Sequence, residues 1–122
     1  MPMQEYIKKI SEFEDKSLLI VDDDNPFRER LARAMEKKGF LVSQAAGVKV
    51  GIESVNSKKP AFAVVDLRLN DGNGLEVVKE IQKNKSDSRI VMLTGYGNIP
   101  TAVAAIKEGA IDYLAKPADA DD

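Results

Sequence analysis

The sequence predicts a doubly wound α/β fold built on a five-stranded parallel sheet. Short apolar runs rich in β-branched residues recur along the chain, at residues 18–21, 40–42, 61–65, 90–93 and 111–114. Between these runs the apolar residues follow helical spacing. Continuous apolar strands that alternate with helices are typical of a parallel sheet covered on both faces.

The first predicted helix has the clearest start and end. Asn25 can cap its N-terminus, Pro26 suits the first helical position, and Gly39 suits the position after its last turn. An apolar face runs along it, made by Phe27, Leu31, Ala34 and Met35. The remaining helices are predicted at residues 48–55, 75–81 and 100–109.

The composition excludes several classes of chemistry. A chain of 122 residues suits one domain, and it contains neither cysteine nor histidine. Disulfides, thiolate metal sites, thiol nucleophiles, Ser-His-Asp hydrolases, histidine-ligated metals and a phosphohistidine on this chain are therefore excluded. Any chemistry must use carboxylates, hydroxyls, lysine, arginine and the backbone.

The charge pattern argues against nucleic-acid and membrane binding. The net charge is −2, from 18 basic and 20 acidic residues, and the two signs are mixed along the sequence. Without a basic stripe, direct binding of nucleic acid by this segment is not expected. The apolar runs are too short to span a membrane, and the N-terminus has no apolar signal region, so we expect a cytoplasmic protein.

Chemically useful side chains follow several of the predicted strands. Residues 22–24 are aspartates after the first strand, Asp66 ends the third, and Thr94 and Lys116 follow the last two. Each alone has an ordinary explanation as a helix cap, a turn residue or a solvated lysine. In such sheets, however, the ligand site lies beyond the carboxyl ends of the strands. Clustered carboxylates repel one another and call for a cation, and an all-oxygen site suits Mg²⁺.

Four motifs in order give the sequence a family resemblance. The stretches LLIVDDDNPFRERL, VVDLRLNDGNGLEVV, MLTGYG and DYLAKP resemble the receiver domain of two-component response regulators, over residues 18–117. Within that family, GNGLEVV, LTGYGNIPTAV and YLAKPADADD are most similar to the RegA/PrrA/ActR group of redox-responsive transcriptional regulators. The resemblance implies the strand order 2-1-3-4-5 of flavodoxin-like and CheY-like sheets.

The resemblance also implies roles for the acidic residues. Asp66 would be the phosphoacceptor, whose carboxylate attacks the phosphoryl group on a phosphohistidine of a partner kinase. Asp23 would bind Mg²⁺ together with Asp66 and the backbone carbonyl of Arg68. Asp22 would act through a metal-bound water and complete the acidic pocket.

Other matched positions would form the switch. Lys116 would pair with one phosphoryl oxygen, and Thr94 would hydrogen-bond another after phosphorylation. Tyr113 would swing from an exposed to a buried position as Thr94 moves. Pro117 is expected to follow a cis peptide bond that aims Lys116.

Two further positions in this family flank the water that hydrolyses the aspartyl phosphate. In this sequence they hold Arg68 and Tyr96, which are both bulky. We expect them to hinder in-line attack by the water and so to prolong the phosphorylated state.

The two ends of the chain depart from the family pattern. Residues 18–122 are predicted to form a receiver domain truncated after its fifth strand, because KPADADD cannot form the amphipathic helix that normally follows. Residues 1–17 form an extension with one apolar helical stripe, made by Met3, Tyr6, Ile7, Ile10 and Phe13. This stripe predicts an amphipathic helix that covers part of the vacant sheet face; a frayed tail, or a helix used elsewhere, is the alternative.

The expected function is a phosphorylation switch rather than an enzyme with its own substrate. The expected partners are a sensor histidine kinase, an output domain outside this segment that carries a DNA-binding helix-turn-helix, and a second copy in a homodimer. A haloacid-dehalogenase-type phosphatase is less well supported, because the nucleophile candidate follows the third strand and Arg68 stands where that class has its acid. A nucleotide switch would need glycine-rich phosphate loops that are absent from the sequence. A receiver-shaped module that is never phosphorylated remains the third alternative.

Overall fold

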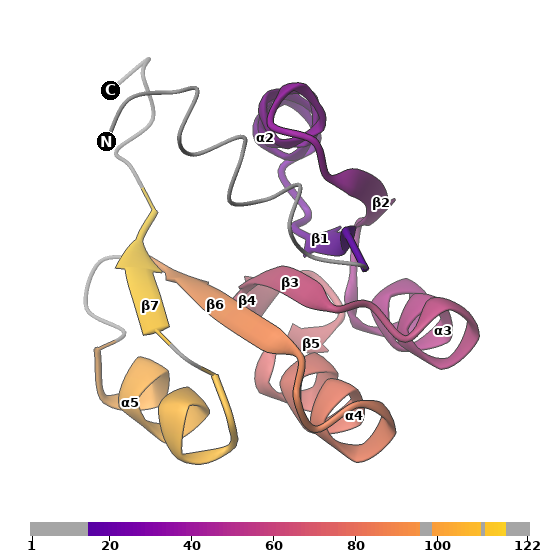
Figure 1. Ribbon diagram of the computed structural model, residues 1–122. Coiled ribbons are helices and arrows are strands. Elements are labelled where there is room, and N and C mark those ends of the chain that lie inside the picture. The colour runs from indigo at the N-terminus through magenta and orange to yellow at the C-terminus, as the bar shows by residue number, and fades with distance from the viewer. Residues whose placement is uncertain (1–14, 96–98, 111, 117–122) are drawn as a thin grey trace.

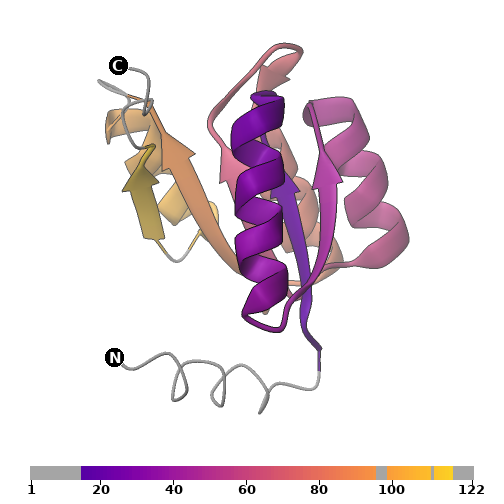
Figure 2. The same ribbon diagram turned by 90° about the horizontal axis from the view of Figure 1, so that it is seen from above.

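The computed structural model describes residues 15–95, 99–110 and 112–116. Its main sheet has five parallel strands in the order β2-β1-β3-β6-β7, which confirms the predicted fold class and strand order (Figure 2). The strands are β1 (Ser17–Val21), β2 (Leu41–Ala45), β3 (Phe62–Asp66), β6 (Arg89–Thr94) and β7 (Asp112–Ala115).

Helices lie on both faces of this sheet. Figure 1 shows α2 on one face, above β1 and β2, and the other three helices on the opposite face. The helices are α2 (Asn25–Lys37), α3 (Val48–Lys58), α4 (Leu75–Asn84) and α5 (Ile99–Lys107). The alternation of strand and helix in the sequence therefore produces the layered arrangement that the pattern predicts.

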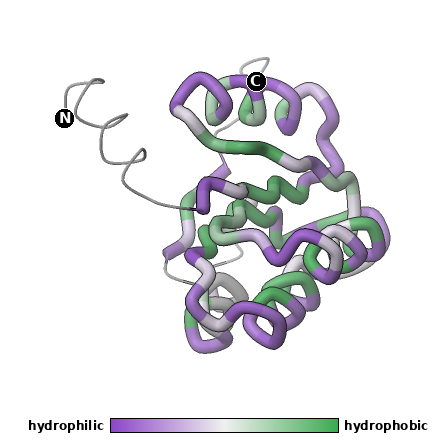
Figure 3. The backbone as a smooth tube through the Cα atoms, turned by 45° about the vertical axis from the view of Figure 1, so that its right-hand side comes forward, coloured by the Kyte–Doolittle hydropathy of each residue, from purple (hydrophilic) through white to green (hydrophobic). Residues whose placement is uncertain are grey.

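The larger of two apolar clusters lies on the side of α3 and α4. Its fully buried side chains include Leu19, Val65, Val78, Ile81 and Ile90. The smaller cluster packs beneath α2, around Leu18, Ile20 and Ala32. Because side chains alternate between the two faces of a strand, both clusters draw on β1, and this explains its unbroken apolar run (Figure 3).

The start of α2 differs in one detail from the prediction. Asp24, rather than Asn25, occupies the N-cap position, and its side chain accepts a hydrogen bond of 3.1 Å from the backbone N–H of Phe27. Pro26 lies in the first turn, as predicted. Gly39 follows the C-cap with a φ of 104°, a left-handed conformation that glycine adopts without strain.

A small hairpin follows β3 that the sequence pattern did not predict. Strand β4 (Arg68–Leu69) pairs antiparallel with β5 (Gly72–Asn73), so the chain turns back at once after Asp66. At the end of the hairpin, a side chain on Gly74 would collide with the carbonyl oxygen of Asp66. The segment between β3 and α4 is therefore folded closely against the end of β3.

Several predictions concern residues outside the described part of the chain. These are the amphipathic helix within residues 1–17, of which only residues 15–17 are described, the cis peptide before Pro117, the absence of a closing helix after β7 and the position of Tyr96. Among the described helices, none is both long and apolar enough to cross a membrane.

Candidate functional site

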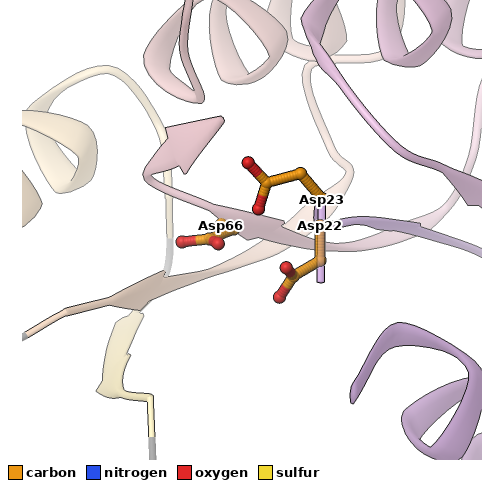
Figure 4. Close-up of side chains that lie close together, drawn as sticks. All are labelled: Asp22, Asp23 and Asp66. Carbon is orange, nitrogen blue, oxygen red and sulfur yellow. The ribbon is translucent and has the colours of Figure 1, made fainter. Parts of the chain in front are cut away.

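An acidic cluster lies at the carboxyl edge of the sheet. Asp22 and Asp23 follow β1 directly, and Asp66 is the last residue of the neighbouring strand β3. Because parallel strands end at the same edge, the three side chains come together there (Figure 4). One carboxylate oxygen from each lies within 4.8 Å of the other two.

The backbone around Asp22 is held by several hydrogen bonds. Its N–H donates to the carbonyl of Ala45 at 3.0 Å, and its own carbonyl accepts from Arg28 Nη1 at 2.9 Å. The side-chain atom Oδ1 accepts from the N–H of Asp24 at 2.9 Å. The Asp22 side chain is 0% exposed, and these hydrogen bonds hold its orientation.

Lys116 supplies the positive charge of the site. Its Nζ lies 3.0 Å from Asp22 Oδ2 and 3.3 Å from Asp66 Oδ2. The backbone N–H of Lys116 donates to the carbonyl of Thr94 at 2.7 Å, and Nζ lies 4.8 Å from the centre of the Phe27 ring. The end of β7 and an aromatic ring of α2 thus hold the ammonium between the two most buried carboxylates.

The pKa of Asp66 is raised to about 6 from its usual 3.8. Burial of the carboxyl group is the main cause, and the negative charge of Asp22 adds to it, while Lys116 acts in the opposite direction. For Lys116 itself, burial alone would lower the pKa, but the hydrogen bond to Asp22 and the charge of Asp66 raise it above its usual value. At Asp66, burial and the charge of Asp22 therefore outweigh the effect of the Lys116 ammonium on the pKa.

The donor set fits a hard divalent cation. All three acidic side chains offer oxygen atoms, and Asp22 Oδ2 is a buried oxygen that accepts no well-aligned hydrogen bond from the described residues. Mg²⁺ and Ca²⁺ both prefer such oxygen ligands, whereas Zn²⁺ prefers nitrogen and sulfur. A divalent cation would also relieve the repulsion between Asp22 and Asp66.

The remaining predicted site residues lie around this cluster. Thr94 ends β6 and is 1% exposed; its Oγ1 donates a long hydrogen bond of 3.5 Å to the carbonyl of Leu114. Tyr113 is half-buried in β7 and packs against the larger apolar cluster. The backbone N–H of Arg68 donates to Asp66 Oδ1 at 3.3 Å, while its side chain is exposed. The structure thus brings the three predicted aspartates and Lys116 together. It places the backbone of Thr94 beside that of Lys116 and leaves Tyr113 in the apolar cluster.

Sequence reasoning missed two residues that contact the site. Arg28 fixes the carbonyl of Asp22 and also bonds Gln44 Oε1 at 3.0 Å, so it ties α2 to β2 as well. Phe27 supports Lys116, although its place in the apolar stripe predicts only packing. The available signal was their position in the first turn of α2, immediately beyond the aspartates.

Comparison with known proteins agrees with this geometry. The family model of the response regulator receiver domain matches residues 18–122. The chain is 61% identical to the photosynthetic apparatus regulatory protein RegA of Rhodobacter capsulatus, an alignment that covers 88% of this chain and 59% of RegA. It is 60% identical to the acid tolerance regulatory protein ActR of Rhizobium meliloti, over 88% of this chain and 56% of ActR. The chain therefore spans little more than half the length of these relatives.

Solved structures show the same fold. One is a response regulator from Burkholderia pseudomallei with a phosphorylated aspartic acid, a calcium ion and citrate. It is 40% identical to this chain, the two superpose with a TM-score of 0.79, and the alignment covers 88% of this chain and 63% of that one. The receiver domain of NtrX from Brucella abortus is 33% identical with a TM-score of 0.75, covering 85% and 88%. On this evidence, the chain belongs to the response regulator receiver domain family and is a receiver domain of a two-component system.

Proposed function

We propose that Asp66 is the phosphoacceptor of this receiver domain and that Mg²⁺ is its cofactor. The observation that carries the proposal is the acidic cluster itself, in which Asp66 lies beside two other carboxylates and a lysine. The β4–β5 hairpin follows Asp66 closely, so the backbone of Arg68 lies beside the Asp66 carboxylate. Asp23, Asp66 and the Arg68 carbonyl would hold the metal, with Asp22 acting through a metal-bound water.

The proposed reaction is a transfer between two nucleophiles. A carboxylate oxygen of Asp66 attacks phosphorus, the phosphorus–nitrogen bond of a phosphohistidine on the kinase breaks, and the released imidazole takes up a proton. The Lys116 ammonium, now 3.3 Å from Asp66, would pair with a phosphoryl oxygen. A bound Mg²⁺ supplies positive charge to the other phosphoryl oxygens during the in-line displacement.

Thr94 and Tyr113 would carry the signal away from the site. Thr94 Oγ1 donates a 3.5 Å bond to the carbonyl of Leu114, which is weak and easily exchanged for one to a phosphoryl oxygen. Tyr113 sits on the next strand, in register with Met92, and is half-buried. The proposed change moves both side chains inward and remodels the surface around α5 and β7.

The partners follow from the same proposal. A sensor histidine kinase would donate the phosphoryl group, and an output domain of the longer protein would respond to the remodelled surface. By similarity to RegA and ActR, the output would be control of transcription through a DNA-binding domain outside this segment. A homodimer formed through the remodelled surface is part of the proposal.

Arg68 and Tyr96 would set the lifetime of the aspartyl phosphate. The backbone N–H of Arg68 lies beside Asp66, and its exposed side chain extends from that position. Replacing Arg68 and Tyr96 together with alanine should speed dephosphorylation severalfold. An unchanged rate would show that Arg68 and Tyr96 do not control the lifetime of the aspartyl phosphate.

The proposal is tested by incubating the chain with Mg²⁺ and acetyl phosphate and recording its intact mass. We expect a gain of one phosphoryl group that disappears with EDTA and in Asp66→Asn. Asp87→Asn, a change at an exposed aspartate far from the cluster, should leave the gain intact. Absence of the gain in the wild-type chain, or its persistence in Asp66→Asn, would contradict the proposal.

A further inference from the structure

The N-terminus of α3 has no capping side chain of its own. Its N-cap residue is Gly47, and the residues before it, Ala45 and Ala46, also carry no polar group. The first N–H groups of a helix have no partner within the helix and need an acceptor from elsewhere. Because the residues just before α3 offer no side-chain acceptor, the cap of this helix has to come from another part of the chain.

Asp71 supplies that acceptor from the hairpin that follows β3. Its Oδ1 accepts from the N–H of Val48 at 2.7 Å, and its Oδ2 accepts from the N–H of Lys49 at 3.1 Å. One carboxylate therefore binds two successive N–H groups of the helix. The negative charge also lies at the positive end of the helix dipole.

The sequence around this contact is adapted to it. A Cβ on Gly47 would lie 2.7 Å from Asp71 Oδ1, so a residue with a side chain there would push the carboxylate away. The two hydrogen bonds, to Val48 first and then to Lys49, lower the pKa of Asp71, which is therefore ionised at neutral pH.

The same hairpin is attached to the acidic cluster at its other end. It begins immediately after Asp66, and the N–H of Arg68 donates to Asp66 Oδ1. Arg68 pairs with Asn73 across the hairpin, and Gly74 packs against the Asp66 carbonyl. The base of the hairpin thus contacts the cluster, while Asp71 at its tip is bonded to α3.

Helix α3 is packed closely against the rest of the fold. Val48, Gly51 and Val55 are buried, and Gly51 lies against the side chains of Val21 and Val77. The β4–β5 ladder by itself contains only two residue pairs and would allow the turn to move. Asp71 connects this short ladder to the packed part of the fold.

We propose that Asp71 is a positioning residue for the metal site: by capping α3 it holds the hairpin so that the Arg68 backbone stays beside Asp66. This inference rests on the proposed function, because it assumes that Mg²⁺ binds there. Removing an outer contact of a metal site typically weakens metal binding by about 10- to 100-fold. Asp71 acts through the hairpin backbone, so we expect the lower end, about tenfold, for Asp71→Ala.

The test measures Mg²⁺ affinity by calorimetry, and thermal unfolding of the metal-free protein in parallel. Ser88→Ala is the matched control: it removes a 2.6 Å bond from Ser88 Oγ to the Pro60 carbonyl, a buried contact at the opposite edge of the sheet. Asp71→Asn is the control for charge, because its amide oxygen can still accept from Val48. We expect Ser88→Ala to lower the melting temperature without changing the Mg²⁺ affinity, and Asp71→Asn to retain most of that affinity.

Amide hydrogen exchange provides a readout that does not depend on the metal. In Asp71→Ala, the amides of Val48, Lys49 and Arg68 should exchange faster than in the wild type, whereas Ser88→Ala should leave them unchanged. The inference is overturned if Asp71→Ala binds Mg²⁺ as tightly as the wild type, or if Ser88→Ala weakens binding equally. It is also overturned if Asp71→Asn loses as much affinity as Asp71→Ala, because charge alone would then explain the loss. A wild-type chain that binds no Mg²⁺ would contradict the proposed function as well.

Discussion

The amino edge of the sheet, where the parallel strands begin, and the carboxyl edge, where they finish, differ in how their buried polar groups are paired. At the amino edge, the buried Ser88 is paired with a neutral group, because its Oγ donates to the Pro60 carbonyl. The N–H of Ala61 donates to Ser17 Oγ at 3.0 Å, and Ser17 in turn donates to the exposed Asp15 carboxylate. At the carboxyl edge, the buried carboxylates of Asp22 and Asp66 share the ammonium of Lys116. Within the described part of the chain, Asp22 Oδ2 accepts no well-aligned hydrogen bond although that ammonium lies 3.0 Å away.

The difference separates the two tasks of the fold. Paired neutral groups stabilise the protein whether or not a ligand is present. Two carboxylates that share one ammonium lower stability until a cation arrives, because their repulsion acts in a site with little water. We therefore expect changes at the acidic cluster to depend on Mg²⁺ and pH, and a change at the contact between Ser88 and Pro60 to depend on neither.

The largest effect is expected for Lys116→Ala. Removing the ammonium leaves two buried carboxylates without their counter-charge, so the free energy of unfolding without metal should fall by about 3 kcal/mol. Mg²⁺ should restore much of this loss, since ligand binding to the native state adds stability. Chemical denaturation with and without Mg²⁺ measures both effects.

Lys85→Ala is the control for that experiment. Lys85 pairs with Asp87 at 3.3 Å on the surface, where such a pair contributes less than about 1 kcal/mol. A loss in Lys116→Ala no greater than in Lys85→Ala would show that the ammonium does not hold the acidic cluster together.

Asp66→Asn should have a smaller effect of opposite sign. It removes a charge that burial and Asp22 disfavour, so the metal-free protein should gain about 2 kcal/mol of stability at pH 7. The gain should shrink in Mg²⁺, which stabilises only the wild type. A loss of stability in the metal-free variant would contradict the assignment of Asp66 as an uncompensated charge.

The pH dependence follows from the same residue. Since the pKa of Asp66 is about 6 in the folded protein and 3.8 ordinarily, the folded state binds the proton more tightly. The contribution of Asp66 to stability is thus fully present below about pH 4 and is lost as the pH rises through 6, by roughly 2 kcal/mol after allowing for screening by solvent. Comparing how the free energy of unfolding of wild type and Asp66→Asn depends on pH isolates the contribution of Asp66. Identical profiles would show that Asp66 makes no such contribution.

The smallest effect is expected at the amino edge. Ser88→Ala leaves the Pro60 carbonyl without its bond from the hydroxyl and should lower the free energy of unfolding by about 1 kcal/mol. This loss should be the same with and without Mg²⁺ and between pH 5 and 8. A loss that changes with Mg²⁺ would break the distinction between the two edges.

Central strands and their polar ends could be predicted from the sequence because both follow from burial. β1 and β3 are buried on their two faces, which requires continuous apolar runs, and Asp22 and Asp66 stand where those runs stop. The prediction was less accurate for the edge strand β2, which was expected at residues 40–42 but runs from Leu41 to Ala45. Its apolar run is short because a strand with one exposed edge tolerates polar residues such as Gln44.

Contacts between residues far apart in the chain could not be predicted in the same way. Asp71 caps a helix that begins at Val48, and the only signal in the sequence is the missing cap at Gly47. A local detail also differed: the sequence analysis placed the cap of α2 at Asn25, whereas the helix begins at Asn25 and its cap is Asp24. Two-residue strands such as β4 carry too little pattern to be recognised.

The most direct test of the central claim is to locate the phosphoryl group. After treatment with Mg²⁺ and acetyl phosphate, borohydride reduction converts an acyl phosphate into an alcohol, so the phosphorylated aspartate becomes homoserine and can be identified by peptide sequencing in the mass spectrometer. We expect homoserine at position 66 alone. Homoserine at position 22 or 23, or at none of the acidic residues, would contradict it.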